Sequence, residues 1–272
     1  MTPFTSPSLR TRVLQGDAVV GVIVKIPSAA SVEMCAAAGF DFVVLDAEHG
    51  SGEMLELEHH IRAAESFGVP VLVRVGQNDP VEILHALDAG ATGIIVPHVC
   101  SVADARAAVQ AAHYPPLGRR GLALTTRAGR HTFTDLHAHL ERARNDTLVI
   151  VQVEDAEALE HVGDISATPH VDVVFLGPTD LALSLGHPGE LDHPVVVGAV
   201  ETFVGAVRRG GSAALGTFAR DEPDTLSWRA RGASFIFLAA TLLFAQRLKQ
   251  VKKGLEEAER ASPSARQPES PS

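Results

Sequence analysis

Two acidic side chains, Glu154 and Asp180, each follow a short apolar run of the sequence. Their carboxylate oxygens are hard ligands of the kind that binds Mg²⁺, Mn²⁺ or Co²⁺. Two such ligands leave coordination positions open for water and for a chelating substrate, and a 2-oxo acid chelates through its carboxylate and carbonyl oxygens. Acidic residues in these places also cap helices, as Asp180 could for one that begins at Leu181. The spacing alone supports a metal site and a pair of helix caps equally.

Three other residues have side chains suited to proton transfer or charge stabilisation. His49 could move protons in either direction, because its unperturbed pKa is about 6.5. The guanidinium of Arg74 presents a fixed fork of donors to an enolate oxygen or a carboxylate. Asp88 lies at the mostly apolar end of a predicted helix, where a carboxylate needs a partner such as a histidine ring N–H. A structural histidine, an internal ion pair and a solvated helix end are the alternative explanations.

An imine formed by a lysine is a different chemistry, and the sequence has only Lys25, Lys249, Lys252 and Lys253 for it. Lys25 alone falls on a predicted strand, close to the predicted site. Desolvation there could lower its pKa and make it a nucleophile. A lysine imine is the less favoured chemistry.

The elements that must position these residues are eight short runs rich in Val, Ile, Leu or Phe, which are typical of fully buried parallel strands. They lie near residues 19–26, 41–46, 70–75, 93–97, 148–153, 172–177, 213–218 and 235–239. Ala-rich stretches with helical spacing separate most of them, and several end in Gly just before the next strand, as helix caps do. Eight such units in roughly 250 residues match a closed (β/α)8 barrel. A doubly wound sheet, which usually has fewer strands, is less favoured.

We therefore predict a single-domain α/β protein, a (β/α)8 TIM barrel over residues 16–258. Residues 1–15 form an N-terminal segment, and the Pro- and Ser-rich residues 259–272 are predicted to be disordered. Active sites of such barrels lie at the carboxyl ends of the strands, so the polar residues that end the runs should converge there. The long interval between the fourth and fifth runs, with Arg120, Arg127 and Arg130, predicts an inserted active-site loop that could meet an acidic substrate.

The composition argues against several classes of partner. Asp and Glu outnumber Lys and Arg by 33 to 23, and the resulting net charge of -10 leaves no basic stripe for a nucleic acid. No segment approaches the ~18 uninterrupted apolar residues of a transmembrane helix, so we expect no membrane association. Cys35 and Cys100 are too few for a disulfide framework and indicate a cytoplasmic location.

The ordered motifs of the chain resemble the HpcH/HpaI aldolase and citrate lyase family, in particular its short-chain branch of metal-dependent pyruvate aldolases. The resemblance extends from about Val20 to Leu243. The motifs are GFDFVVLDAEHG at 39–50, VPVLVRV at 69–75, LDAGATGIIVPHV at 87–99, YPPLGRRG at 114–121, VQVED at 151–155 and GPTDLALSLG at 177–186. The resemblance implies a (β/α)8 barrel that uses Mg²⁺, Mn²⁺ or Co²⁺ to cleave or form 4-hydroxy-2-oxo acids through a pyruvate enolate. Its small-molecule partners would be a 2-oxo acid and an aldehyde.

By the same resemblance, Glu154 and Asp180 are metal ligands, Arg74 stabilises the enolate, and His49 with Asp88 forms a proton-transfer dyad. The expected substrate-binding residues are Gln152, Gly177, Pro178, Thr217 and Phe218. The family also implies a homohexamer in which a C-terminal helix, here within residues 240–255, is exchanged between subunits.

Three positions depart from the family pattern. Leu238-Ala239-Ala240 stands where relatives often carry a glycine and an aspartate, Thr217-Phe218 replaces an aliphatic pair, and Lys25 replaces a small or apolar residue. A bulky Phe218 could redirect substrate choice, and Lys25 could bind an extra anionic group. Two alternative functions remain, a coenzyme A thioester lyase and a barrel that has lost catalysis. The first lacks a clear basic site for adenosine phosphates, and the second conflicts with the intact set of polar residues.

Overall fold

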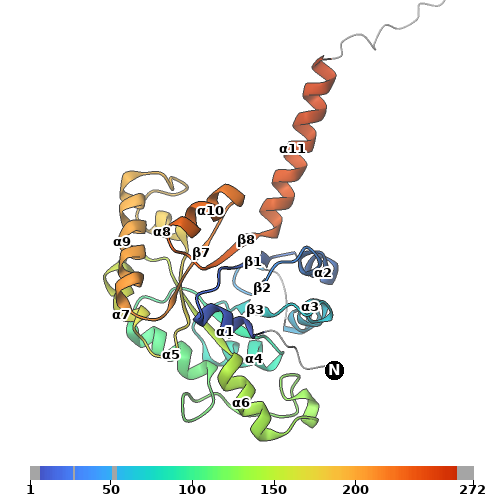
Figure 1. The fold of residues 1–272 in the computed structure, drawn as a ribbon, viewed down its shortest axis with the longest axis vertical. Helices are drawn as coiled ribbons and strands as arrows, with labels where there is room; N and C mark the ends of the chain where they lie inside the picture. The colour runs from blue at the N-terminus through green and yellow to red at the C-terminus, as the bar shows by residue number, and fades with distance from the viewer. Residues whose placement is uncertain (1–6, 27, 51–53, 262–272) are drawn as a thin grey trace, which may run out of the picture.

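The computed structural model describes residues 7–26, 28–50 and 54–261, and its eight parallel strands close into a barrel in chain order (Figure 1). The strands are β1 Val19–Val24, β2 Phe42–Asp46, β3 Val71–Arg74, β4 Gly93–Val96, β5 Leu148–Val153, β6 Val173–Leu176, β7 Ala214–Phe218 and β8 Phe235–Ala239. The α-helices are α1 Leu9–Leu14, α2 Ala29–Ala37, α3 Met54–Ser66, α4 Pro80–Asp88, α5 Val102–Ala112, α6 Leu136–Asp146, α7 Val162–Ser166, α8 Pro178–Ser184, α9 Pro194–Gly210, α10 Glu222–Ala230 and α11 Ala240–Ala261. Two short 3-10 helices are η1 Arg130–Thr132 and η2 Ala156–His161. The predicted (β/α)8 barrel is confirmed.

Side chains of the strands alternate between two cores, because the side-chain period of a strand is two. Inward side chains such as Ile23 and Phe175 form one buried cluster inside the barrel, and outward ones pack under the helices. The register pairs Asp46 of β2 with Arg74 of β3, and Ile23 of β1 with Ala239 of β8. Asp46 and Arg74 therefore face inward at the carboxyl ends of neighbouring strands, which is the mouth of the barrel.

Aromatic rings fill the middle of the barrel. Phe42 of β2 stacks on Phe235 of β8 with ring centroids 4.5 Å apart. A Cβ atom on Gly21 of β1 would lie 2.2 Å from the Phe42 ring, so the close approach of that ring requires glycine here. Phe175 and Phe237 form a second stacked pair, also with centroids 4.5 Å apart. The barrel is therefore a packed core, and only its mouth is open to chemistry.

Helix α1 closes the amino-terminal end of the barrel. Leu9 and Val13 are buried and belong to the inner cluster. Arg10 Nε lies 3.0 Å from both carboxylate oxygens of Asp172, and Arg10 Nη2 lies 2.9 Å from Oδ1. The Val149 N–H donates to the same carboxylate over 2.9 Å. Burial nevertheless raises the pKa of Asp172, so its ionised form depends on these partners.

The long segment between α5 and β5 lies at the same end of the barrel as α1. It leads from a helix into a strand, and such connections run to the amino ends of the strands. Arg120 Nη2 donates to Asp88 Oδ1, at the end of α4, over 2.7 Å, and the Ala128 N–H donates to the Asp88 carbonyl. The prediction that this segment forms an active-site loop is therefore wrong within a single chain.

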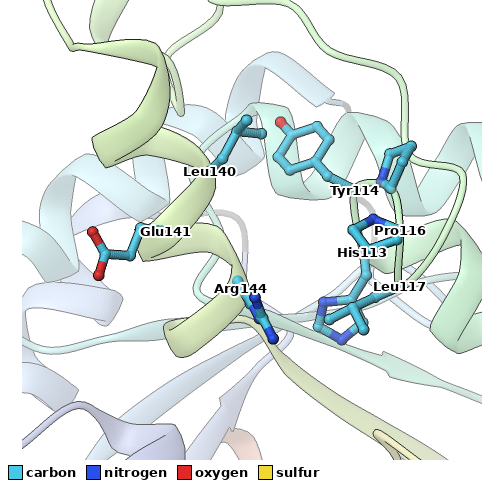
Figure 2. A pocket seen from close by; sticks show the side chains of 8 residues that line it. His113, Tyr114, Pro116, Leu117, Leu140, Glu141 and Arg144 are labelled. Carbon is cyan, nitrogen blue, oxygen red and sulfur yellow. The ribbon is translucent and has the colours of Figure 1, made fainter.

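A pocket of about 210 Å³ opens between this segment and α6 (Figure 2). Tyr114 lines it on one side, and Leu140 and Arg144 of α6 line it on the other. The Tyr114 hydroxyl lies 3.0 Å from His139 Nε2, and the Arg120 guanidinium carbon lies 4.7 Å from the centroid of the Tyr114 ring. These contacts fasten the segment to its neighbouring helices, which is a structural role for its aromatic and basic residues.

Helix α11 begins directly after β8 and projects from the barrel (Figure 1). It continues to Ala261, so residues 259–261 of the predicted tail are helical, and residues 262–272 lie outside the described residues. At the other end, the predicted N-terminal segment contains α1, which belongs to the barrel floor. Within the described ranges, no helix is long and apolar enough to cross a membrane.

The ion pair at the barrel floor makes a prediction about stability. Arg10→Met should lower the free energy of unfolding by about 3 kcal/mol, because it leaves a buried carboxylate short of its main partner. Arg10 and Asp172 side chains are only 14% and 2% exposed, which limits screening by solvent. Urea denaturation of the two proteins side by side measures the difference.

The matched control is Arg12→Met on the same helix. Arg12 pairs with Asp41, and both side chains are about a third exposed, at 30% and 29%. Its loss should cost less than about 1 kcal/mol. Equal losses for the two variants would contradict the role assigned to the floor pair.

Candidate active site

The mouth of the barrel is organised by a buried ion pair between Asp46 and Arg74. Arg74 Nε donates to Asp46 Oδ1 over 2.9 Å, and Nη2 donates to Oδ2 over 2.7 Å. Burial alone would raise the pKa of Asp46, but the hydrogen bonds and charge of Arg74 hold it below its usual value. The remaining Arg74 nitrogen, Nη1, lies 3.1 Å from Glu48 Oε2. The guanidinium is thus fixed in one orientation at the end of β3.

The strand β5 carries the second part of the site, Gln152 and Glu154, which share a face because they are two residues apart. Gln152 Nε2 donates to Glu154 Oε2 over 2.5 Å, and the His98 backbone N–H donates to Glu154 Oε1 over 3.2 Å. Among the described residues, the buried Gln152 Oε1 has no hydrogen-bond partner. A Cβ atom on Gly177 would lie 2.4 Å from Glu154 Oε2, so glycine at this position gives the carboxylate its space. The predicted Gly177 therefore acts through Glu154.

Ionisation of the buried Glu154 carboxylate costs free energy. Its side chain is 1% exposed. Its pKa is raised to about 7: burial is the largest cause, Gln152 and His98 oppose the rise, and the nearby negative charge of Asp180 adds to it. A divalent cation among these oxygens would offset that cost, because an opposite charge favours the ionised carboxylate.

His98 links the two parts of the site, and sequence reasoning did not single it out. It follows β4 in a left-handed conformation, with φ 51°. Its Nδ1 lies 3.0 Å from Asp155 Oδ2 and 3.6 Å from Glu154 Oε1, and its Nε2 lies 3.7 Å from Glu48 Oε1. Burial alone would lower the pKa of His98, but these carboxylates raise it. Its place directly after an apolar run, in the motif that ends VPHV, was the available signal.

These residues fit a divalent metal ion. One potential ligand atom from each of Glu48, His98 and Glu154 lies within 4.8 Å of the others. Oxygen donors suit Mg²⁺ or Mn²⁺, and an imidazole is also compatible with Mn²⁺ or Co²⁺. Asp180 lies in the first turn of α8, close enough for its charge to act on Glu154, although it is outside this compact set. Glu48 was also missed as a candidate ligand, although it lies only two residues after Asp46, the last residue of β2.

The predicted pair of His49 and Asp88 is not formed within this chain. The His49 side chain is 54% exposed at the mouth, and its Nε2 lies 4.0 Å from Glu48 Oε1. Asp88 ends α4 at the floor of the barrel and binds Arg120 there. Helices of the barrel run opposite to its strands, so a residue at a helix end cannot reach the mouth of the same barrel. His49 stays a candidate for proton transfer without Asp88 of its own chain.

The predicted pair Thr217 and Phe218 is divided between the two faces of β7. Thr217 is fully buried, and its register partner Leu176 belongs to the outer core, so its side chain faces the helices. Phe218 faces inward, in edge contact with Phe237 at a centroid distance of 6.2 Å. Pro178 is buried as the first residue of α8. Phe218 can shape the pocket, whereas Thr217 cannot reach it.

Lys25 is the inward residue after β1, with Nζ 3.4 Å from Asp46 Oδ2. An imine-forming lysine depends on apolar surroundings that favour the neutral amine. Lys25 instead lies beside the negative charge of the Asp46 carboxylate. Its surroundings favour an ion pair and argue against imine chemistry.

A (β/α)8 barrel whose mouth combines a fixed arginine with a compact acidic and imidazole cluster has a site suited to a metal-assisted enzyme. Residues 20–245 match the family model described as HpcH/HpaI aldolase/citrate lyase, and the chain belongs to this family.

Named relatives agree with this assignment. The chain is 37% identical over 220 residues to a pyruvate aldolase of Rhizobium etli, covering 81% of this chain and 85% of the relative. It is 35% identical over 199 residues to a 4-hydroxy-2-oxo-heptane-1,7-dioate aldolase of Klebsiella pneumoniae, covering 73% and 74% of the two chains. A crystal structure of an HpcH/HpaI aldolase/citrate lyase family protein from Burkholderia cenocepacia superimposes with a TM-score of 0.85 at 32% identity, covering 92% and 98%.

The buried charge on Glu154 makes a prediction about pH. With a chelator present, Glu154 should lower the free energy of unfolding as the pH rises from 4.5 to above about 7. The folded chain holds this proton more tightly than the unfolded chain, so ionisation favours unfolding, by up to about 3 kcal/mol. Glu154→Gln should remove this component. Urea denaturation across that range measures the difference between wild type and variant.

Glu157→Gln is the matched control. Glu157 is exposed on η2, and its substitution makes the same chemical change outside the site. It should keep the wild-type pH dependence. Identical pH profiles for wild type and Glu154→Gln would contradict the cost assigned to this carboxylate.

Proposed function

We propose that this protein is a divalent-metal-dependent aldolase that cleaves or forms 4-hydroxy-2-oxo acids through a pyruvate enolate. Family membership and the activities for which its relatives are named support the reaction class. The observation that carries the proposal is the position of Arg74, which is fixed by Asp46 beside the Glu154 cluster. A rigid cation next to a metal-binding cluster is suited to an oxygen that becomes negative during reaction.

In this mechanism Glu154 and Asp180 would hold the metal ion, with Glu48 and His98 as nearby donors. The ion supplies Lewis acidity, which makes the methyl group of pyruvate easier to deprotonate. Arg74 stabilises the enolate oxygen, and its hydrogen bonds to Asp46 keep the guanidinium in place as charge develops.

Proton transfer and substrate orientation fall to other groups of the mouth. His49 is exposed there and is the residue proposed to move a proton. The amide of Gln152, whose carbonyl oxygen has no hydrogen-bond partner in the described ranges, orients the substrate beside Glu154. Phe218 provides an apolar wall for the aldehyde. In synthesis the enolate carbon attacks the aldehyde, and in cleavage the same bond breaks after the 4-hydroxyl group loses its proton.

The enolate half-reaction gives the sharpest test. Pyruvate methyl protons should exchange with D2O, followed by NMR, when Mg²⁺, Mn²⁺ or Co²⁺ is present, and exchange should stop with excess chelator. Glu154→Gln and Asp180→Asn should each slow exchange by about 100-fold or more, because each removes a charged ligand. Circular dichroism checks that both variants are folded.

Glu157→Gln, outside the site, should exchange at the wild-type rate. Exchange that persists in chelator would contradict the metal mechanism. Absence of exchange with every metal would favour a thioester donor or a barrel without catalysis.

We further propose that the protein acts as a homo-oligomer, a hexamer by family resemblance, in which α11 packs against another copy. The exposed apolar residues of this helix support the proposal: Phe244 61%, Leu248 55%, Val251 46% and Leu255 58% exposed. Their spacing of four, three and four residues forms one stripe along the helix, as in helix pairs. Such a stripe on a projecting helix needs a partner surface.

Leu248→Glu should weaken this association, because it places a charge in the stripe. Size-exclusion chromatography with light scattering should detect smaller species than in wild type. Gln246→Glu adds the same charge on the opposite side of α11 and should leave the mass unchanged. A monomeric wild type, or no effect of Leu248→Glu, would contradict the proposed packing.

A cytoplasmic location belongs to the same proposal. Cys35 and Cys100 are free thiols, which suits a reducing compartment. The net charge of -10 argues against a nucleic acid partner, so the expected partners are the 2-oxo acid, the aldehyde and further copies of the chain.

A further inference from the structure

Lys25 occupies the mouth of the barrel without a part in the reaction proposed above. The inward residues of β1 are Val19 and Ile23, and the period of two places Lys25 on the same face, one level higher. Its Nζ lies 3.4 Å from Asp46 Oδ2, which confirms the inward direction. The side chain is 35% exposed, so it is only partly covered at the mouth.

Asp46 is already well satisfied without this lysine. Two hydrogen bonds come from Arg74, at 2.9 and 2.7 Å, and the backbone N–H groups of Glu48 and His49 donate over 3.2 and 3.3 Å. The Lys25 contact is longer than a charge-assisted hydrogen bond, which is typically about 2.7–2.9 Å. An ammonium group has three donors, and in the described part of the chain Asp46 is its one carboxylate within ion-pair distance. Donors therefore remain for another anion.

A small residue lies beside the end of β1 that carries Lys25. On the neighbouring strand β8, the residue next to Ile23 is Ala239, whose small side chain fills little of the mouth. On the other side, Arg74 shares the same Asp46 carboxylate, so Lys25 lies close to the residue proposed to stabilise the enolate. An anion bound to Lys25 would therefore lie close to the group proposed to stabilise the enolate.

We propose that Lys25 is a specificity-determining residue that binds the carboxylate of an acceptor aldehyde. The aldehyde carbon then meets the enolate carbon beside Arg74, while the far end of the same molecule pairs with the ammonium group. The aldol step needs no other reactant: the carbon–carbon bond forms, and the aldehyde oxygen takes up one proton. This inference rests on the proposed aldolase function, and it names a class of acceptor, aldehydes that carry a carboxylate.

The experiment compares acceptors matched in length, succinic semialdehyde against butanal, with pyruvate as donor. The kcat/KM ratio of the charged to the neutral aldehyde should favour the charged one in wild type. Lys25→Met should lower this ratio at least about tenfold, through a higher KM for succinic semialdehyde. Lys25→Arg, which keeps the charge, should retain much of the preference. Lys249→Met on α11 is the control for loss of a surface lysine.

The outcomes separate specificity from structure. If Lys25 only supported Asp46 and Arg74, Lys25→Met would slow both aldehydes equally, and the unchanged ratio would overturn the inference. A wild type without preference for succinic semialdehyde would also overturn it. Pyruvate exchange in D2O, measured on the same wild-type sample, distinguishes these results from a failure of the aldolase proposal, in which exchange itself is absent and both proposals fall.

Discussion

The arrangement of the mouth depends on the buried ion pair between Arg74 and Asp46. A guanidinium in a protein interior must be paired and hydrogen-bonded, and here the carboxylate comes from the neighbouring strand at the same register level. The same carboxylate accepts the N–H groups of Glu48 and His49, which bends the chain after β2. The outer nitrogen of Arg74 then holds Glu48 at 3.1 Å. One pair thus positions a fixed cation, an acidic side chain and the loop that carries the histidine.

The second constraint on the mouth is the repulsion between its carboxylates, which lowers stability, whereas the Arg74–Asp46 pair is attractive. Glu48, Glu154 and Asp155 surround one imidazole, that of His98, and Glu154 is so deeply buried that its pKa rises to about 7. Like charges at this spacing reduce stability unless a cation lies among them. Without a cation, this acidic cluster lowers the stability of the fold relative to a neutral core. Binding of a positive ion removes the repulsion between the carboxylates. Gly177 makes room for the Glu154 carboxylate at this position, because a side chain there would displace it.

The fold followed from the sequence because buried parallel strands are continuous apolar runs, and eight of them in one chain suggest closure. The polar residues at the ends of these runs included Arg74 and Glu154, which were therefore candidates for the site. The family resemblance assigned both Thr217 and Phe218 to the pocket, whereas neighbouring residues on a strand face opposite sides. The apolar run before His98 marked it as a residue at a strand end, but its contacts with three carboxylates depend on its own left-handed backbone, which the sequence pattern does not reveal.

The place of Asp88 depends on the difference between the two ends of the barrel. Residues after strands collect at the mouth and residues after helices collect at the floor, and the packed core of stacked phenylalanines lies between the two ends. Asp88 and the buried Arg120 form their own ion pair at the floor, and no movement of a side chain brings either to the mouth of the same barrel. A part for Asp88 in the reaction therefore requires the floor of one copy to meet the mouth of another. The projecting α11, with its apolar stripe, supplies a surface for association between copies. Whether catalysis is complete in one chain or shared between chains is thus decided by how the copies pack, and the chemistry of the mouth, built on Arg74 and Glu154, is common to both arrangements.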